Sequence, residues 1–139
     1  MKQVRRCVSI LLVCVLMLTT SAFAATKASD QIVSYSIYAT PIGNGKITID
    51  FTIMATGIMK EIGAEDIYVY EVTSHGLEQK VHYDKEDPEM ILTDTWRQAE
   101  DIIFYGEAGK EYYITVTIYA KDYNNQSDSR FKSFYVTAD

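Results

Sequence analysis

The sequence predicts an all-β protein, an antiparallel β-sandwich of about seven strands. Apolar and polar side chains alternate through residues 46–56 and 111–121, which is the two-residue period of a strand with one buried face. Turn-forming residues separate segments of this kind at intervals of about a dozen residues. No window after residue 24 has the 3.6-residue period of a helix. Short strands in succession without helices are typical of two antiparallel sheets packed face to face.

The expected strands differ in how clear their alternation is. In residues 46–56, Ile47, Ile49 and Phe51 alternate with polar side chains, and residues 111–121 repeat this pattern from Tyr112 onward. The other segments are shorter or less regular, and they are recognised by the β-branched and aromatic residues that lie between turns. The segments predicted to be strands are residues 31–40, 46–56, 66–73, 77–83, 101–105, 111–121 and 130–137.

Three of the connections are predicted to be turns or polar loops. Residues 41–45 form a hairpin turn, in which Asn44-Gly45 supplies the positive φ angles that a tight hairpin needs. Residues 84–89 form a charged loop that contains Pro88, and residues 122–128 form the polar tip of the last hairpin.

Two further stretches are less regular. Residues 57–65 are expected to be irregular, with Met59 and Ile62 filling the end of the core. Residues 90–98 fit either a ragged strand or a loop, and they hold the only tryptophan, Trp96, which is expected to be part of the core. Because neither stretch has a sustained alternation, periodicity alone does not decide its structure.

Residues 1–24 predict that the chain is exported. They begin with a basic segment and continue with an apolar run over residues 7–18, which is too short to cross a bilayer readily. They end with small residues at the positions that a signal peptidase reads, so cleavage is expected between Ala24 and Ala25. The mature protein is then a single domain of residues 25–139 without a further run of spanning length, and it is expected to be secreted.

The charge and the cysteines of the mature chain narrow the range of partners. Removing 24 residues from 139 leaves 115, with 10 basic and 19 acidic side chains and a net charge of −9. This balance argues against nucleic acids and anionic membranes, which bind basic surfaces. Both cysteines, Cys7 and Cys14, lie in the signal peptide, so the mature domain is expected to fold without a disulfide.

Residues 109–120 carry a family resemblance. Gly109-Lys110 precedes Tyr112, which opens a strand of alternating aliphatic residues that ends near Ala120. This segment, with the hairpin and strand that follow it, resembles the penultimate strand of fibronectin type III and related immunoglobulin-like domains. The resemblance implies an immunoglobulin or fibronectin type III-like sandwich. It also implies a tyrosine corner at Tyr112, whose hydroxyl would bond to backbone upstream.

The mature chain as a whole is similar to small secreted single-domain β-sandwich proteins of Gram-positive bacteria. The shared features are a strand that ends near Met54-Ala55-Thr56-Gly57, the segment Ile62-Gly63-Ala64, the strand Ile67-Tyr68-Val69-Tyr70 and the Gly-Lys-x-Tyr corner at residues 109–112. The similarity implies export and a sandwich fold, and it transfers no catalytic residues.

No catalytic residue, cofactor or metal site is expected. A zinc site would need the only two histidines, His75 and His82, together with acids such as Asp84, whereas histidines beside a turn are usually solvated. The carboxylates of residues 84–89 lie in an acidic loop, unlike the opposed and partly buried pair of a glycosidase. Residues 122–128 lack the glycine of a calcium loop. Loose calcium binding at either loop stays open.

Five tyrosines are the candidate ligand-binding residues, because they lie on the faces opposite the aliphatic rows of their strands. If their strands are neighbours, the rings would form a patch that stacks on sugar rings or anchors a protein partner. The alternative is that they only stabilise an exposed sheet face, since tyrosine has a high β propensity. The candidates are Tyr38, Tyr68, Tyr70, Tyr113 and Tyr119.

The sequence therefore favours a secreted, non-catalytic domain that binds a protein partner or associates with the cell surface. The alternative is a carbohydrate-binding or cell-wall-binding module that uses exposed tyrosines. A third class, a small hydrolase, would require buried carboxylates with perturbed pKa values beside a pocket. Coplanar exposed rings would favour a sugar ligand, a flat apolar patch would favour a protein, and a deep polar cleft would favour an enzyme.

Overall fold

The structure, a computed structural model, describes residues 31–139. The predicted signal peptide and its cleavage site lie outside these residues. Every regular element of the described chain is a β-strand, and no helix within it could cross a membrane. The elements are β1 (Ile32–Gly43), β2 (Lys46–Met59), β3 (Glu61–Thr73), β4 (Gly76–Asp84), β5 (Ile91–Leu92), β6 (Thr95–Tyr105), β7 (Glu111–Lys121) and β8 (Ser127–Thr137).

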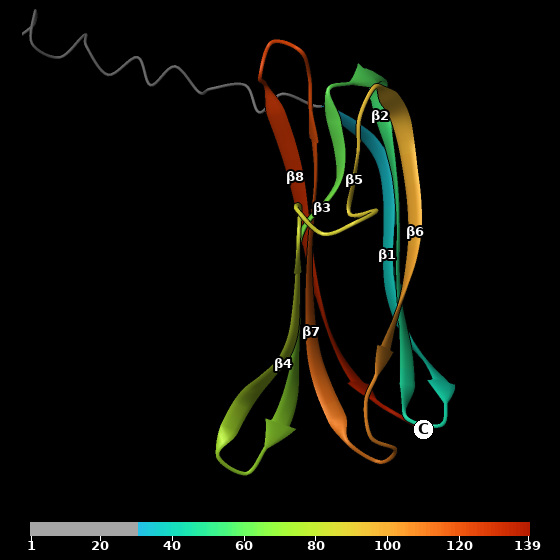
Figure 1. The fold of residues 1–139 in the computed structure, drawn as a ribbon, viewed down its shortest axis with the longest axis vertical. Coiled ribbons are helices and arrows are strands. Elements are labelled where there is room, and N and C mark those ends of the chain that lie inside the picture. Colours follow the sequence, from blue (N-terminus) through green and yellow to red (C-terminus); the bar gives the residue numbers. More distant parts are fainter. Residues whose placement is uncertain (1–30) are drawn as a thin grey trace, which may run out of the picture.

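The strands form two antiparallel sheets that pack face to face (Figure 1). Sheet A has the order β1-β2-β6, and sheet B has the order β4-β3-β7-β8, with the two-residue strand β5 pairing with β3. Seven long strands in this arrangement confirm the predicted all-β, antiparallel β-sandwich of about seven strands. Figure 1 shows β5 in the space between the two layers.

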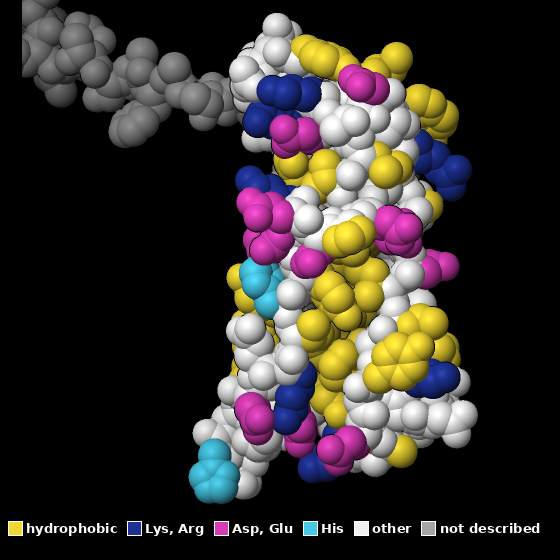
Figure 2. Space-filling view, viewed as in Figure 1, with side chains coloured by type: hydrophobic (Ala, Val, Ile, Leu, Met, Phe, Trp, Pro, Cys, Tyr) yellow, Lys and Arg dark blue, Asp and Glu magenta, His cyan; other side chains and the backbone are white. Residues whose placement is uncertain are grey.

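The core consists of the inward rows of both sheets, as the two-residue alternation predicts. The row of β2 includes Ile47, Ile49 and Phe51, and it faces the aliphatic rows of β3 and β7. Figure 2 shows apolar side chains between the layers along the side where β4 and β6 form the sheet edges. Partly buried Val81 and Ile102 come from these two edge strands.

The prediction that residues 57–65 are irregular is wrong. Strand β2 continues to Met59 and β3 begins at Glu61, and both Met59 and Ile62 are buried in the core, where they were expected. Two features conceal the strands in the sequence. The pairing of β2 with β6 is interrupted after Met54, and β3 contains a bulge between Ala64 and Asp66. Each irregularity breaks the two-residue alternation locally.

The bulge in β3 changes which side chains face outward. Ala64 pairs with Ile118 and Asp66 pairs with Thr117, so Glu65 is an extra residue without a partner on β7. In a regular strand Glu65 and Asp66 would lie on opposite faces. With the bulge, both line the same depression on the outer face of sheet B.

Residues 90–98, which the sequence left undecided, contain β5 and the start of β6. Strand β6 begins at Thr95, whereas the sequence predicted a start at residue 101. The prediction missed the first part of the strand because its inward residue Gln98 is polar, which conceals the alternation of apolar and polar residues. The buried Gln98 Nε2 donates hydrogen bonds to the carbonyl oxygens of Glu89, at 2.6 Å, and Met90, at 3.3 Å. These bonds tie the chain before β5 to sheet A.

The expectation that Trp96 belongs to the core is wrong. Its side chain is 48% exposed, because it lies near the start of β6, an edge strand of sheet A. The predicted start of the last strand also moves, from residue 130 to Ser127. The hairpin between β7 and β8 is therefore tighter than the sequence indicates.

Tyr112 forms a tyrosine corner. Its hydroxyl accepts the backbone N–H of Glu107, five residues upstream, at 2.8 Å. The buried ring packs edge-on against Phe104, with the ring centroids 5.0 Å apart. This contact joins the end of β6 in sheet A to the start of β7 in sheet B.

Candidate binding face

A continuous row of aromatic side chains crosses the outer face of sheet B. The cross-strand register pairs Tyr68 with His82, Tyr70 with Tyr113, and Tyr113 with Tyr135. Tyr68 and Tyr70 alternate with the buried Ile67 and Val69, so their side chains point away from the core. We call the following residues the aromatic strip: His82 from β4, Tyr68 and Tyr70 from β3, Tyr113 from β7, and Tyr135 from β8.

The rings of the aromatic strip contact one another in sequence. Tyr68 and His82 stack with centroids 4.0 Å apart and planes only 4° from parallel. Tyr68 and Tyr70 are 5.9 Å apart at 16°, Tyr70 and Tyr113 are 6.3 Å apart at 33°, and Tyr113 and Tyr135 are 4.7 Å apart at 39°. At the β4 end the nearly parallel rings therefore cover each other's faces, and at the β8 end the ring planes are tilted relative to each other.

The structure brings together three of the five predicted tyrosines. Tyr68, Tyr70 and Tyr113 lie in the aromatic strip. Tyr38 does not, because β1 belongs to sheet A, and its exposed ring lies under the Lys132 ammonium, 5.1 Å from the centroid. Tyr119 is on the outer face of sheet B but is only 7% exposed, so it is not part of an open patch.

Sequence reasoning missed two members of the aromatic strip. The tight hairpin between β7 and β8 sets the position of Tyr135. Because Lys121 pairs with Ser127, Tyr113 lies opposite Tyr135. His82 was interpreted as a solvated surface histidine, which is wrong. It is partly buried, it stacks on Tyr68, and its Nε2 lies 2.7 Å from Asp66 Oδ1. The other histidine, His75, is exposed in the turn after β3, as expected.

A depression of about 210 Å³ adjoins the β4 end of the aromatic strip. The bulge in β3 directs Glu65 and Asp66 into it, and Asp66 pairs with Asp84 across β3 and β4. We call this depression, lined by Glu65, Asp66, His82, Asp84, Lys85 and Glu86, the acidic recess. It has four carboxylates and one lysine, and His82 belongs both to it and to the aromatic strip.

Carboxylates also affect the nearest ring of the aromatic strip. Desolvation, followed by the negative charge of Asp66, raises the pKa of the Tyr68 hydroxyl, and Asp84 contributes in the same direction. A tyrosine hydroxyl is protonated at neutral pH without any shift, and the raised pKa leaves it a hydrogen-bond donor. The electrostatic potential at this end of the strip is negative.

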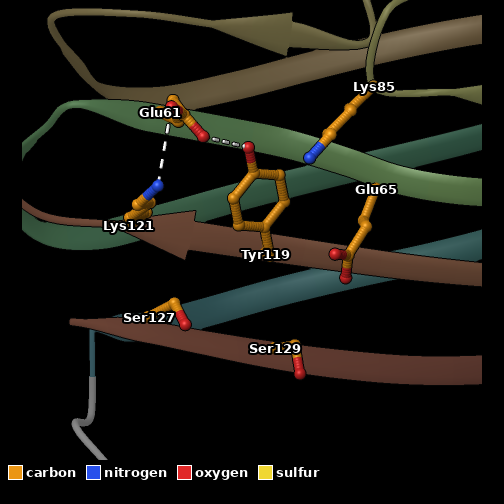
Figure 3. A pocket seen from close by; sticks show the side chains of 7 residues that line it. All are labelled: Glu61, Glu65, Lys85, Tyr119, Lys121, Ser127 and Ser129. Atoms are coloured by element: carbon orange, nitrogen blue, oxygen red, sulfur yellow. Dashed lines mark hydrogen bonds and ion pairs between the residues drawn. The ribbon is translucent and has the colours of Figure 1, made fainter. Parts of the chain in front are cut away.

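A second depression, of about 220 Å³, lies over Tyr119 (Figure 3). The Tyr119 hydroxyl donates a hydrogen bond to Glu61 Oε2 at 2.5 Å, and Lys121 Nζ lies 3.8 Å from Glu61 Oε1. Burial and this bond raise the pKa of Tyr119, and the same bond lowers the pKa of Glu61. Glu65 and Lys85 flank the ring on the side away from Glu61. Glu61 therefore joins the Tyr119 hydroxyl and the Lys121 ammonium.

The acidic loops have structural roles in the turns. In the loop after β7, Asp122 Oδ1 accepts the backbone N–H groups of Asn124 and Gln126, both at 2.8 Å. In the loop after β4, Asp87 accepts the N–H of Asp84 at 2.8 Å, and Asp84 accepts that of Glu86 at the same distance. Within residues 31–139, no group of three or more histidine, cysteine or acidic side chains converges as metal ligands do.

The binding face thus combines the aromatic strip with the acidic recess at one of its ends. Its groups suit recognition through ring contacts, hydrogen bonds and charge. No protein-family model and no curated protein matches this sequence, so the assignment of function rests on these residues.

Proposed function

We propose that this chain is a secreted, non-catalytic β-sandwich domain that binds a protein partner through the aromatic strip. The observation that supports the proposal is the contact of five aromatic rings across the four strands of the outer face of sheet B, where Tyr135 is exposed and the other four rings are partly exposed. Tyrosine is enriched in protein interfaces because it combines a large apolar ring with a polar hydroxyl. Single cross-strand pairs of rings are enough to stabilise a sheet. This row extends from one edge of sheet B to the other, which is more than that structural role requires.

The ring geometry favours a protein over a sugar at the β4 end of the strip. Sugars stack on the open faces of aromatic rings, whereas Tyr68 and His82 cover each other's faces at 4.0 Å. What these rings offer to a ligand is their edges and the Tyr68 hydroxyl. Ring edges and hydroxyls fit the mixed apolar and polar surface of a protein partner.

The net charge supports a protein partner, and the predicted signal peptide supports a location outside the cell. Residues 31–139 alone carry 18 acidic and 9 basic side chains, a net charge of −9, which opposes binding to nucleic acid or an anionic membrane. The leader at residues 1–24 supports action outside the cell or at its surface.

A carbohydrate or cell-wall ligand is the second candidate, and the β8 end of the strip favours it. Tyr135 is 65% exposed, and its plane is tilted by 39° from that of Tyr113. An exposed ring at the end of a row is a platform on which a sugar can stack. This candidate requires Tyr135 to contribute more to binding than Tyr68 does.

The proposal is tested by removing rings of the strip and measuring binding to envelope proteins and to insoluble polysaccharides of the source organism. The triple variant Tyr70→Ser/Tyr113→Ser/Tyr135→Ser is expected to bind envelope protein at least about ten-fold more weakly than the wild type, because aromatic anchors dominate interface energies. The control is Tyr105→Ser, since Tyr105 is 71% exposed on sheet A, and it is expected to bind normally.

Two results would contradict the proposal. If the triple variant, folded by circular dichroism, still binds envelope protein as the wild type does, the strip is not the interface. If binding is saturable on polysaccharide, survives protease treatment of the target and is lost in Tyr135→Ser alone, the carbohydrate function replaces it.

A further inference from the structure

Resting on the proposed function, we infer that the protein partner presents a basic segment to the outer face of sheet B. The segment lies along the aromatic strip, and one of its arginine or lysine side chains enters the acidic recess.

The charge of the binding face selects a cationic partner. Asp66 and Asp84 form a cross-strand pair of like charges beside the Tyr68–His82 stack, and Glu65 and Glu86 add two further carboxylates. Lys85 is the one lysine among the residues that line the recess. Like charges directly opposite each other destabilise a sheet, and a cation between them would relieve their repulsion.

The other lysine near this edge, Lys80 on β4, does not alter this charge balance. Its ammonium is 2.8 Å from Glu71 Oε2 and 2.9 Å from Glu78 Oε1, so two carboxylates already neutralise it. On the opposite side of the strip, the outward positions beside Tyr113 and Tyr135 are Thr115 and Ser133. Those two positions are uncharged, and on the other side of Tyr113 and Tyr135 the outward pair is Glu111 and Thr137. The charges nearest the strip in sheet B are therefore mainly negative, which favours a cationic partner.

The size of the recess points to one side chain of a larger molecule. A pocket that encloses a small-molecule ligand measures about 300–1,000 Å³, and the acidic recess measures about 210 Å³. Its carboxylates do not converge as the ligands of a metal ion would. Separate carboxylates next to aromatic rings suit an extended cation, and the planar guanidinium of arginine matches them best.

A second copy of this chain is a poor occupant of the same face. Each copy carries a net charge of −9 over residues 31–139, and bringing two acidic recesses together would increase the repulsion. Complementarity therefore requires a partner of the opposite sign. His82 connects the two halves of the face, because it lines the recess and stacks on Tyr68.

The test uses two blocked hexapeptides, one alternating arginine with threonine and one alternating glutamate with threonine. Backbone amide shifts in NMR titrations of the whole domain report where each peptide binds. The arginine peptide is expected to shift residues of the recess and the strip, and the glutamate peptide is expected to shift none. The double variant Glu65→Gln/Asp66→Asn is expected to weaken binding of the arginine peptide at least about five-fold.

The matched control removes the same charge from the other sheet. Asp50 and Asp101 pair across β2 and β6, and Asp50→Asn/Asp101→Asn is expected to change the affinity less than about two-fold. Equal weakening by both double variants would mean that only net charge attracts the peptide, which overturns the inference. Shifts confined to other surfaces, or no shifts at all, would overturn it as well.

The same variants separate this inference from the proposed function. If the triple tyrosine variant loses the envelope partner while Glu65→Gln/Asp66→Asn retains it, the strip is an interface but its partner is not basic. If the arginine peptide binds the recess while the tyrosine variant retains the envelope partner, the strip is not the interface and the proposed function fails.

Discussion

Gly63→Ala is expected to lower the free energy of unfolding by about 3 kcal/mol or more. A Cβ on Gly63 would lie 2.0 Å from the carbonyl oxygen of Met90 and 2.5 Å from Gln98 Oε1. The backbone of β5 lies directly beside Gly63, which pairs with Ile91, and the φ angle of Gly63 is +155°, which disfavours side chains. Neither the Met90 carbonyl nor the buried Gln98 can retreat without breaking the hydrogen bonds that hold β5.

Urea unfolding of the variant, followed by fluorescence, measures this effect. Gly57→Ala is the matched control, because nothing lies within 4 Å of a Cβ at Gly57, and its stability is expected to stay within about 1 kcal/mol of the wild type. If the two variants unfold at the same urea concentration, β5 does not pack against Gly63 in solution.

Tyr112→Phe is expected to cost about 1–3 kcal/mol of stability, because it removes the acceptor for the Glu107 N–H from a partly buried site. For a domain of about 100 residues each kcal/mol lowers the melting temperature by about 4–8 °C. The ring remains, so its packing on Phe104 is retained and the loss reports on the hydroxyl alone.

Thermal unfolding followed by circular dichroism provides the measurement. Tyr105→Phe removes a hydroxyl from an exposed ring and is expected to leave the melting temperature within about 1 °C of the wild type. An unchanged melting temperature in Tyr112→Phe would show that the corner hydrogen bond adds nothing to stability.

The fold was predictable from the sequence where burial follows a simple alternation. The inward rows of β2 and β7 were identified because each reads as a continuous series of apolar residues at every second position. Residues 57–65 and 90–98 could not be read in this way. In the first, a bulge shifts the alternation at Glu65. In the second, the polar Gln98 occupies an inward position where the alternation of a strand predicts an apolar residue.

The candidate site was predictable only in part, because a sequence shows faces of strands but not which strands are neighbours. Tyr68, Tyr70 and Tyr113 were selected from their alternation alone, and they are adjacent because β3 pairs with β7. The same reasoning included Tyr38, whose strand lies in the other sheet. Tyr119 has the expected orientation, but Glu61 and its neighbours cover it, which depends on side-chain contacts that no periodicity reveals.

Because of the bulge at Glu65, the number of residues in β3 decides which side chains face the core, just as their identity does. Deleting Glu65 would restore an uninterrupted ladder between β3 and β7 while turning the residues before it to the opposite faces. Ile62 and Ala64 would then leave the core for solvent, and Glu61 would be driven into it. A single-residue deletion here is therefore expected to be tolerated far less well than one in the loop after β7, so natural length variation among homologues should avoid this strand.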